Sequence, residues 1–169
     1  MTMINKINKF SKSEFTKVFA NIFENASWIA EELYNQKPFN SFDELSSKMI
    51  NIFEVSSKEK KLEILNAHPD LADRTKISLL TRESMNEQSG AGLDQCSEDE
   101  FNEFKKLNLI YKKFSFPFIL AVKGKNKNEI LRNFRKRILS TPEKEFEEAI
   151  KQVKKIASFR LEEIRDKNI

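Results

Sequence analysis

The chain has 169 residues, of which 39% are hydrophobic and 33% charged, a normal balance for one globular domain with a real core. The 30 basic and 26 acidic residues give a net charge of +4, which does not require nucleic acid as a partner but would suit an anionic small molecule. Three glycines and four prolines leave little material for the turns of an all-β fold. With Cys96 as the only cysteine, an intramolecular disulfide is excluded, and a reducing compartment fits.

The beginning of the chain contains no long apolar stretch, as its first letters MTMINKINKFSKSEF show. We therefore expect neither a secretory signal nor a membrane span, and we predict a cytoplasmic location. One histidine and one cysteine also argue against a zinc site, because zinc prefers several such ligands. No metal is predicted.

The predicted elements are helices, because apolar residues recur with the 3.6-residue period between the glycines and prolines. Helix-start signals with the spacing of a capping box occur at Ser11 with Glu14, Ser41 with Glu44, and Ser97 with Glu100. A further start is predicted at Thr141, since Pro142 suits the first position of a long final helix. Only FPFILAV, residues 116–122, could form a strand. We predict an all-α, single-domain helical bundle over residues 1–169, with residues 1–10 loosely ordered.

The only histidine of the chain, His68, stands in the segment HPDLADR. Pro69 disfavours the helical conformation for the residue before it, so we expect the preceding helix to end at His68. Pro69 can then begin the next helix, which leaves the imidazole at a junction between two helices. Imidazole is the side chain that exchanges protons near neutral pH, although a lone histidine is more often structural. Both interpretations stay open at this point.

A second group of polar residues falls on a helix predicted over TKISLLTRESMNEQ. On such a helix Ser84, Glu87 and Gln88 share the side that carries Ile77 and Leu80. The spacings of three and four residues place Ser84 beside both of the other polar residues. A solvated polar end of an amphipathic helix is the alternative.

The final helix has an apolar stripe that should face the core, made of Phe146, Ile150, Val153, Ala157 and Ile164. Arg160 falls inside this stripe. A guanidinium directed inward needs a partner, because an unpaired buried charge is too costly to keep. Alternatively, its stem packs on the core while its head reaches water. A histidine, a carboxylate, a hydroxyl and an arginine on inward faces would suit a cofactor-free site for an anion.

Five segments together are similar to one known family, the 2-oxo-4-hydroxy-4-carboxy-5-ureidoimidazoline (OHCU) decarboxylases. They are ENASWIAEELYNQKPF (24–39), ILNAHPDLA (64–72), TRESMNEQSGAGL (81–93), LNLIYKKFSFPFILAV (107–122) and VKKIASFRLEEI (153–164). The resemblance implies an all-helical fold, a homodimer and the last step from urate to allantoin. That step is decarboxylation of OHCU, an anionic ureidoimidazoline, to S-allantoin and CO2. It implies no cofactor, no nucleic acid and no membrane as partners.

The resemblance also implies roles for particular residues. His68 would be the catalytic acid/base, and Glu87 would support it. Arg160 would be the substrate-binding arginine. The implied substrate-binding residues are Pro69, Ser84, Met85, Asn86, Glu87, Gln88, Phe118, Ile119, Leu120, Ala121, Val122 and Arg160. One departure is Ser115, where the family usually has glycine; if the position needs a positive φ, serine costs about 1 kcal/mol or more.

Two other hypotheses are less favoured. The first is a related helical protein that acts on another ureido acid or has lost activity. The second is a basic module for nucleic acid, built on KGKNKNEILRNFRKR, residues 123–137. Because Ile130, Leu131 and Phe134 interleave with its basic residues, that segment is more typical of an amphipathic helix with a solvated face.

Overall fold

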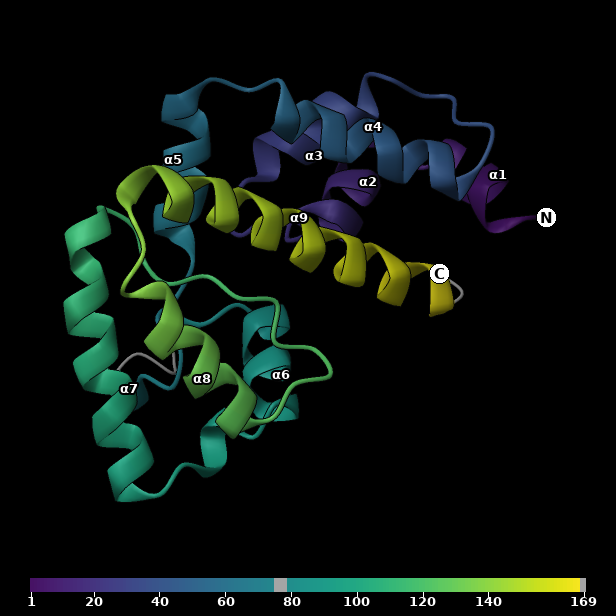
Figure 1. Ribbon diagram of the computed structural model, residues 1–169. Helices are drawn as coiled ribbons and strands as arrows, with labels where there is room; N and C mark the ends of the chain where they lie inside the picture. The colour runs from purple at the N-terminus through teal and green to yellow at the C-terminus, as the bar shows by residue number, and fades with distance from the viewer. Residues whose placement is uncertain (75–78, 168–169) are drawn as a thin grey trace. The chain divides into compact units, whose positions relative to one another are not determined.

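The computed structural model describes residues 1–74 and 79–167, and over these residues the chain forms helices and no β-strand (Figure 1). The predicted all-α fold is therefore confirmed. The chain divides into two compact units, Met1–Ile64 with Lys154–Ile169, and Leu65–Val153. Helices α5 (Lys58–Ala67) and α9 (Pro142–Asp166) each contribute residues to both units. The single domain expected over residues 1–169 stays a prediction.

Four helices belong wholly to the first unit: α1 (Met3–Asn8), α2 (Lys12–Phe19), α3 (Ser27–Tyr34) and α4 (Phe42–Glu54). The capping box predicted at Ser11 and Glu14 is present and begins α2. Aromatic rings contribute to the core of this unit, where Phe15 packs 4.7 Å from Phe19 and Phe23 packs 4.9 Å from Phe53, measured between ring centroids. This agrees with the large number of phenylalanines in the sequence.

The N-terminal residues form a helix that contacts the rest of the first unit. Residues 1–10, expected to be loosely ordered, contain helix α1, and its Ile7 is fully buried. The side-chain amide of Asn8 donates to the carbonyl oxygen of Phe39 at 2.8 Å and accepts from the Phe39 backbone N–H at 2.8 Å. This contact is made to a residue 31 positions away, which no local sequence pattern reveals, and the loose order expected of residues 1–10 stays a prediction.

The second unit contains α6 (Arg82–Gly90), η2 (Leu93–Gln95), α7 (Glu98–Tyr111), η3 (Lys112–Phe114) and α8 (Lys127–Arg137). The capping box predicted at Ser97 and Glu100 begins α7. Residues 116–122 form neither helix nor strand, yet Phe118 to Val122 are all buried. The apolar run is therefore core-facing but irregular, which explains why periodicity did not assign it to either class.

Helix α6 begins later than predicted. Its N-cap is Thr81, whose hydroxyl oxygen accepts from the backbone N–H of Ser84 at 3.2 Å. Leu80 therefore precedes the helix, and Ile77 lies outside the described residues. The helix expected to begin at Pro69 is also absent, since Pro69 and Asp70 have no helical structure. Threonine at the N-cap favours a helix start at this point over an earlier one, because its side chain accepts from one of the first backbone N–H groups of the helix.

Helix α9 buries a different face from the one predicted. Val153, Ala157 and Arg160 are buried as expected, whereas Phe146, Ile150 and Ile164 are only half-buried. The buried positions that the stripe left out are Glu145, Ala149, Gln152, Ile156 and Leu161. Polar residues at two of these positions obscured the pattern.

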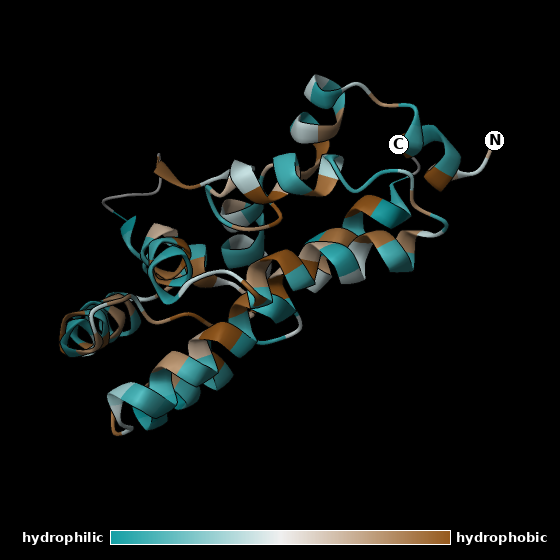
Figure 2. Ribbon diagram, turned by 90° about the horizontal axis from the view of Figure 1, so that it is seen from above, coloured by the Kyte–Doolittle hydropathy of each residue, from teal (hydrophilic) through white to brown (hydrophobic). Residues whose placement is uncertain are grey.

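Individual helices carry both hydrophobic and hydrophilic residues, as the hydropathy colouring shows (Figure 2). Among the described residues, no helix is both long enough and apolar enough to cross a bilayer.

Candidate active site

His68 lies directly after α5, where the helix ends as the following proline predicted. Its side chain is almost buried, with 9% of the residue exposed, and it lines a cavity of about 390 Å³ in the second unit. Among the other residues that line this cavity are Pro69, Asn108, Lys112 and Ser115. A cavity of this volume accommodates a small molecule, and its lining mixes polar and apolar groups as ligand sites do.

The loop after His68 is held by two side-chain amides that come from different helices. Gln88 of α6 accepts from the Ala72 backbone N–H at 3.1 Å, and its own NH2 group donates to the Asp70 carbonyl oxygen at 3.3 Å. Asn108 of α7 donates to the Leu71 carbonyl oxygen at 3.1 Å. Ala72 has a φ of +56°, so these bonds also fix a backbone conformation that L-residues seldom adopt. Three side-chain hydrogen bonds therefore support the loop that presents His68.

The candidate residues on α6 fall into two groups. Ser84 and Gln88 are buried and Glu87 is half-buried, whereas Met85 and Asn86 are exposed on the helix. The structure therefore gives the first three the inward placement expected from their spacing. Met85 is 43% exposed, an unusually large fraction for an apolar side chain.

Residues Phe118 to Val122 bury all of their side chains. The ring of Phe118 stacks on Phe134 of α8, with centroids 3.8 Å apart and planes at 8°. Since these side chains are occupied in the core, any ligand contact by this segment would be made mainly by its backbone. Two of its backbone groups already have side-chain partners, Ile119 O with Arg137 and Ala121 N with Gln152.

Ser115 adopts the left-handed conformation that its glycine-like place in the sequence suggested, with φ +67° and ψ +12°. It ends η3 and lies on the wall of the cavity that His68 also lines. A serine in this conformation is strained, because its Cβ crowds the following carbonyl oxygen, and glycine has no Cβ to do so.

Replacing this residue, Ser115→Gly, should raise the free energy of unfolding by about 0.5–1 kcal/mol. The relief of left-handed strain, about 1–2 kcal/mol, exceeds the extra conformational entropy that glycine loses on folding, about 0.5–1 kcal/mol. Ser47→Gly, at an exposed position inside α4, is the matched control and should lower stability by about 0.5 kcal/mol. Urea unfolding of both variants measures the difference; two equal losses would contradict the strain at Ser115.

Arg160 belongs to the first unit and is 3% exposed. An inward-facing guanidinium was expected to need a partner, and the structure shows that this partner is Glu24, whose Oε2 accepts from Nη2 at 2.9 Å. Nη1 donates to the Asn21 carbonyl oxygen at 2.7 Å. Both charged side chains are nearly inaccessible, so this is a desolvated ion pair. The alternative in which the head of Arg160 reaches water is therefore wrong.

Sequence reasoning missed several polar residues that shape these structures, notably Glu24, Asn108, Arg137, Glu145 and Gln152. A signal was present on α9, because Glu145, Ala149, Gln152 and Ile156 recur at the spacing of a buried face. Among the described residues, no group of three or more His, Cys, Asp or Glu side chains could hold a metal ion.

The fold and this cavity define a class: a helical protein whose only histidine lines a cavity of small-molecule size. The family model described as OHCU decarboxylase matches residues 8–162. A uric acid degradation bifunctional protein from Bacillus sp. (strain TB-90) is 41% identical over 165 residues, which cover 97% of this chain and 32% of that protein. The 2-oxo-4-hydroxy-4-carboxy-5-ureidoimidazoline decarboxylase of Halalkalicoccus jeotgali is 38% identical, over 95% of this chain and 90% of that protein.

A solved structure, the crystal structure of (S)-allantoin synthase, resembles the fold with a TM-score of 0.77 at 30% identity. The similarity covers 97% of this chain and 54% of that one. The chain thus spans about a third of the bifunctional relative and nearly all of the Halalkalicoccus protein. It belongs to the OHCU decarboxylase family.

Proposed function

We propose that this protein catalyses the decarboxylation of OHCU to S-allantoin and CO2, the last step from urate to allantoin. The observation that carries this proposal is the family match over residues 8–162, which includes the histidine that lines the cavity. The rival hypothesis of a nucleic-acid module loses support, because Ile130, Leu131 and Phe134 of α8 are buried against the core. The other rival, a relative that acts on another ureido acid or is inactive, is addressed by the assay below.

The reaction needs acid/base groups and no external electron acceptor. Carbon 4 of the substrate carries both the carboxylate and a hydroxyl, and the neighbouring carbon 5 is doubly bonded to nitrogen. When the bond from carbon 4 to the carboxylate breaks, CO2 leaves and the electron pair moves into this C=N group, whose nitrogen takes a proton. The hydroxyl proton then leaves oxygen and carbon 5 gains a proton, which gives the carbonyl and stereocentre of allantoin. One proton is consumed overall.

His68 is proposed to take the hydroxyl proton and return a proton to carbon 5. Its imidazole lines the cavity, and the loop that follows it is held by Gln88 and Asn108. A positioned acid/base of this kind contributes about 10²- to 10⁴-fold in rate. Glu87 is proposed to fix the imidazole tautomer. Because the substrate also decays slowly to racemic allantoin, protonation of a single face is the distinct contribution of the enzyme.

The remaining roles concern substrate binding. Arg160 is proposed to bind the anionic or carbonyl edge of the substrate, since a guanidinium has five N–H donors and its orientation is fixed by Glu24. Ser84 and Gln88 are proposed as side-chain contacts from α6, together with the exposed Met85 and Asn86. Pro69 and residues 118–122 are proposed to form the pocket wall.

The proposal predicts faster loss of OHCU when this protein is added to substrate generated from urate. The decay should accelerate with protein concentration, and the rate should be unchanged after exhaustive chelation or after addition of pyridoxal phosphate or thiamine diphosphate. Loss of turnover on chelation that a single metal restores would contradict the cofactor-free reaction. A decay rate independent of the protein would favour the inactive or altered-specificity relative.

We also infer a homodimer that works in the cytoplasm. The dimer rests on the resemblance to a family that is commonly dimeric, and the compartment on the single cysteine, which fits a reducing environment. Light scattering should give twice the 19.8 kDa of the chain. A particle of one chain's mass at assay concentration would contradict the dimer.

A further inference from the structure

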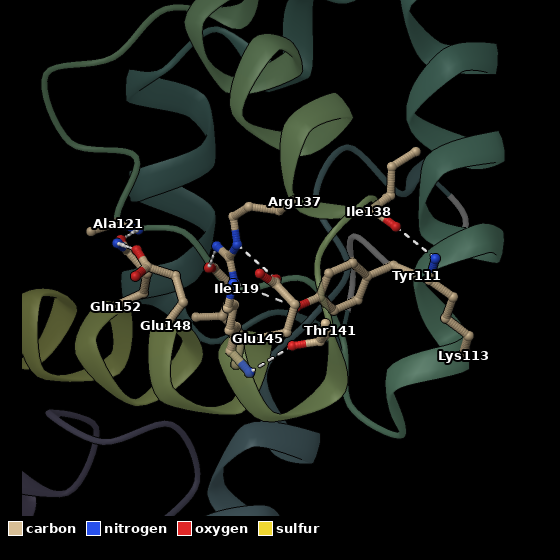
Figure 3. Close-up of polar contacts among 11 residues, drawn as sticks. Tyr111, Lys113, Ile119, Ala121, Arg137, Ile138, Thr141, Glu145, Glu148 and Gln152 are labelled. Carbon is tan, nitrogen blue, oxygen red and sulfur yellow. Dashed lines mark hydrogen bonds and ion pairs between the residues drawn. The ribbon is translucent and has the colours of Figure 1, made fainter.

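A buried polar network in the second unit connects α7, α8 and α9 to the irregular segment 118–122 (Figure 3). Arg137 lies at its centre. The guanidinium Nε donates to Glu145 Oε1 at 2.8 Å, and Nη1 donates to the Ile119 carbonyl oxygen. The hydroxyl of Tyr111 donates to the same carboxylate oxygen at 2.6 Å. Arg137 also lies over the Phe118 ring, with Cζ 4.5 Å from its centroid.

The network is desolvated throughout. Arg137 is 7% exposed and Glu145 2%, although both stand on amphipathic helices whose other charged residues mostly face solvent. Burial raises the pKa of the Tyr111 phenol, and its hydrogen bond to Glu145 raises that pKa further. The phenol therefore stays protonated and donates to the carboxylate at physiological pH.

A buried ion pair is weak evidence for stability, because apolar residues of similar volume are often as good or better. The Arg137–Glu145 pair does something that an apolar pair could not: it supplies a donor to the Ile119 carbonyl. Because the part of the chain that the structure describes contains no strand to pair with this segment, side chains hydrogen-bond to its backbone instead. A second side chain also bonds to the backbone of this segment, since Gln152 Oε1 accepts from the Ala121 N–H at 2.9 Å. We call these two side-chain-to-backbone hydrogen bonds, from Arg137 and from Gln152, the tethers of residues 118–122.

We propose that Arg137, oriented by Glu145, is a positioning residue that fixes the backbone of residues 118–122 for substrate binding, and that Gln152 assists it from α9. This inference rests on the proposed function, in which that backbone forms part of the pocket wall. Arg137 touches no substrate itself. It sets the place of peptide groups that do, so its loss should weaken substrate binding more than it slows the chemical step.

The test compares Arg137→Lys with Tyr111→Phe. A lysine ammonium keeps the positive charge beside Glu145. It lacks the planar guanidinium group with which Arg137 donates to Glu145 and to the Ile119 carbonyl oxygen at the same time. Phenylalanine removes the Tyr111 hydroxyl and with it a long 3.4 Å hydrogen bond from Arg137 Nη2, but it keeps the bonds from Arg137 to Glu145 and to the Ile119 carbonyl oxygen. We expect Arg137→Lys to raise KM about tenfold, the scale of one hydrogen bond to a charged group, with kcat changed much less. Tyr111→Phe should lower thermal stability and leave KM unchanged.

A merely structural Arg137 would behave differently. Partial unfolding lowers kcat in proportion to the folded fraction and leaves the KM of the folded molecules alone, so an unchanged KM in Arg137→Lys would overturn the proposal. Equal KM increases in both variants would overturn it as well.

If Arg137→Lys does not fold, Gln152→Met removes the second tether and should also raise KM. A KM equal to that of the wild type would then be the contradicting result. Arg135→Lys, on the exposed side of the same helix, is the control.

Hydrogen exchange of the ligand-free protein separates this inference from the proposed function. Peptides that contain residues 118–122 should exchange at least about tenfold faster in Arg137→Lys than in wild type or Arg135→Lys. If wild type lacks decarboxylase activity but this difference is found, the function fails and the tether stands. If activity is present and exchange is unchanged, the tether fails alone.

Discussion

Replacement of His68 by Asn should abolish stereoselective formation of allantoin and return the reaction to its spontaneous rate. Asparagine fills a similar volume and keeps hydrogen-bonding atoms, but it cannot exchange a proton near neutral pH. The expected loss is about 10²- to 10⁴-fold in kcat. It is measured from the initial rate at which optical activity appears during OHCU turnover.

Stability decides how this result is interpreted. His68 lines a cavity, and the side-chain amides of Gln88 and Asn108 hold the loop that follows it. We therefore expect the helical circular dichroism and the melting temperature of His68→Asn to stay close to wild type. If the variant unfolds instead, His68 is a core histidine and the assignment as acid/base is wrong.

Arg160→Lys should lower kcat/KM by roughly tenfold or more, about 1.4 kcal/mol, the scale of a hydrogen bond between charged groups. Lysine keeps the charge but loses the planar fork that now holds Asn21 O and Glu24 together. Arg165→Lys, five residues further along α9 and exposed, is the matched control. Steady-state kinetics of both variants, at a temperature well below their melting transitions, make the comparison.

The buried ion pair adds a stability cost that must be kept apart from the kinetic effect. Lysine can approach Glu24, but the Asn21 carbonyl then loses a donor, so some loss of stability accompanies Arg160→Lys. Wild-type kcat/KM in a folded Arg160→Lys would show that the arginine serves only the core of the first unit. The anion-binding group would then have to be sought elsewhere.

Much of the fold could be predicted because its signals are local. Capping boxes at Ser11 and Ser97 use residues three positions apart, and Pro69 acts on its immediate neighbour. Errors arose where two local signals competed. Thr81 begins a helix inside a segment whose apolar pattern suggested an earlier start, and Gln152 interrupts the apolar stripe of α9 with a buried amide.

The candidate site was harder to predict because its supports are distant in sequence. Arg160 was expected to need a partner, but nothing local indicated that Glu24, 136 residues earlier, would be that partner. Asn108 reaches a carbonyl 37 residues away, and Arg137 reaches one 18 residues away. Such bonds depend on how helices pack, and helix periodicity alone carries no information about them.

The most direct test of the proposed function is the optical activity of allantoin formed from OHCU, which is generated in place from urate. With this protein present, S-allantoin should appear in large excess and faster than the spontaneous decay of the substrate. Without it, or with His68→Asn, the product should be racemic and slow to form. Racemic allantoin produced at the spontaneous rate in the presence of folded wild-type protein would contradict the proposed function.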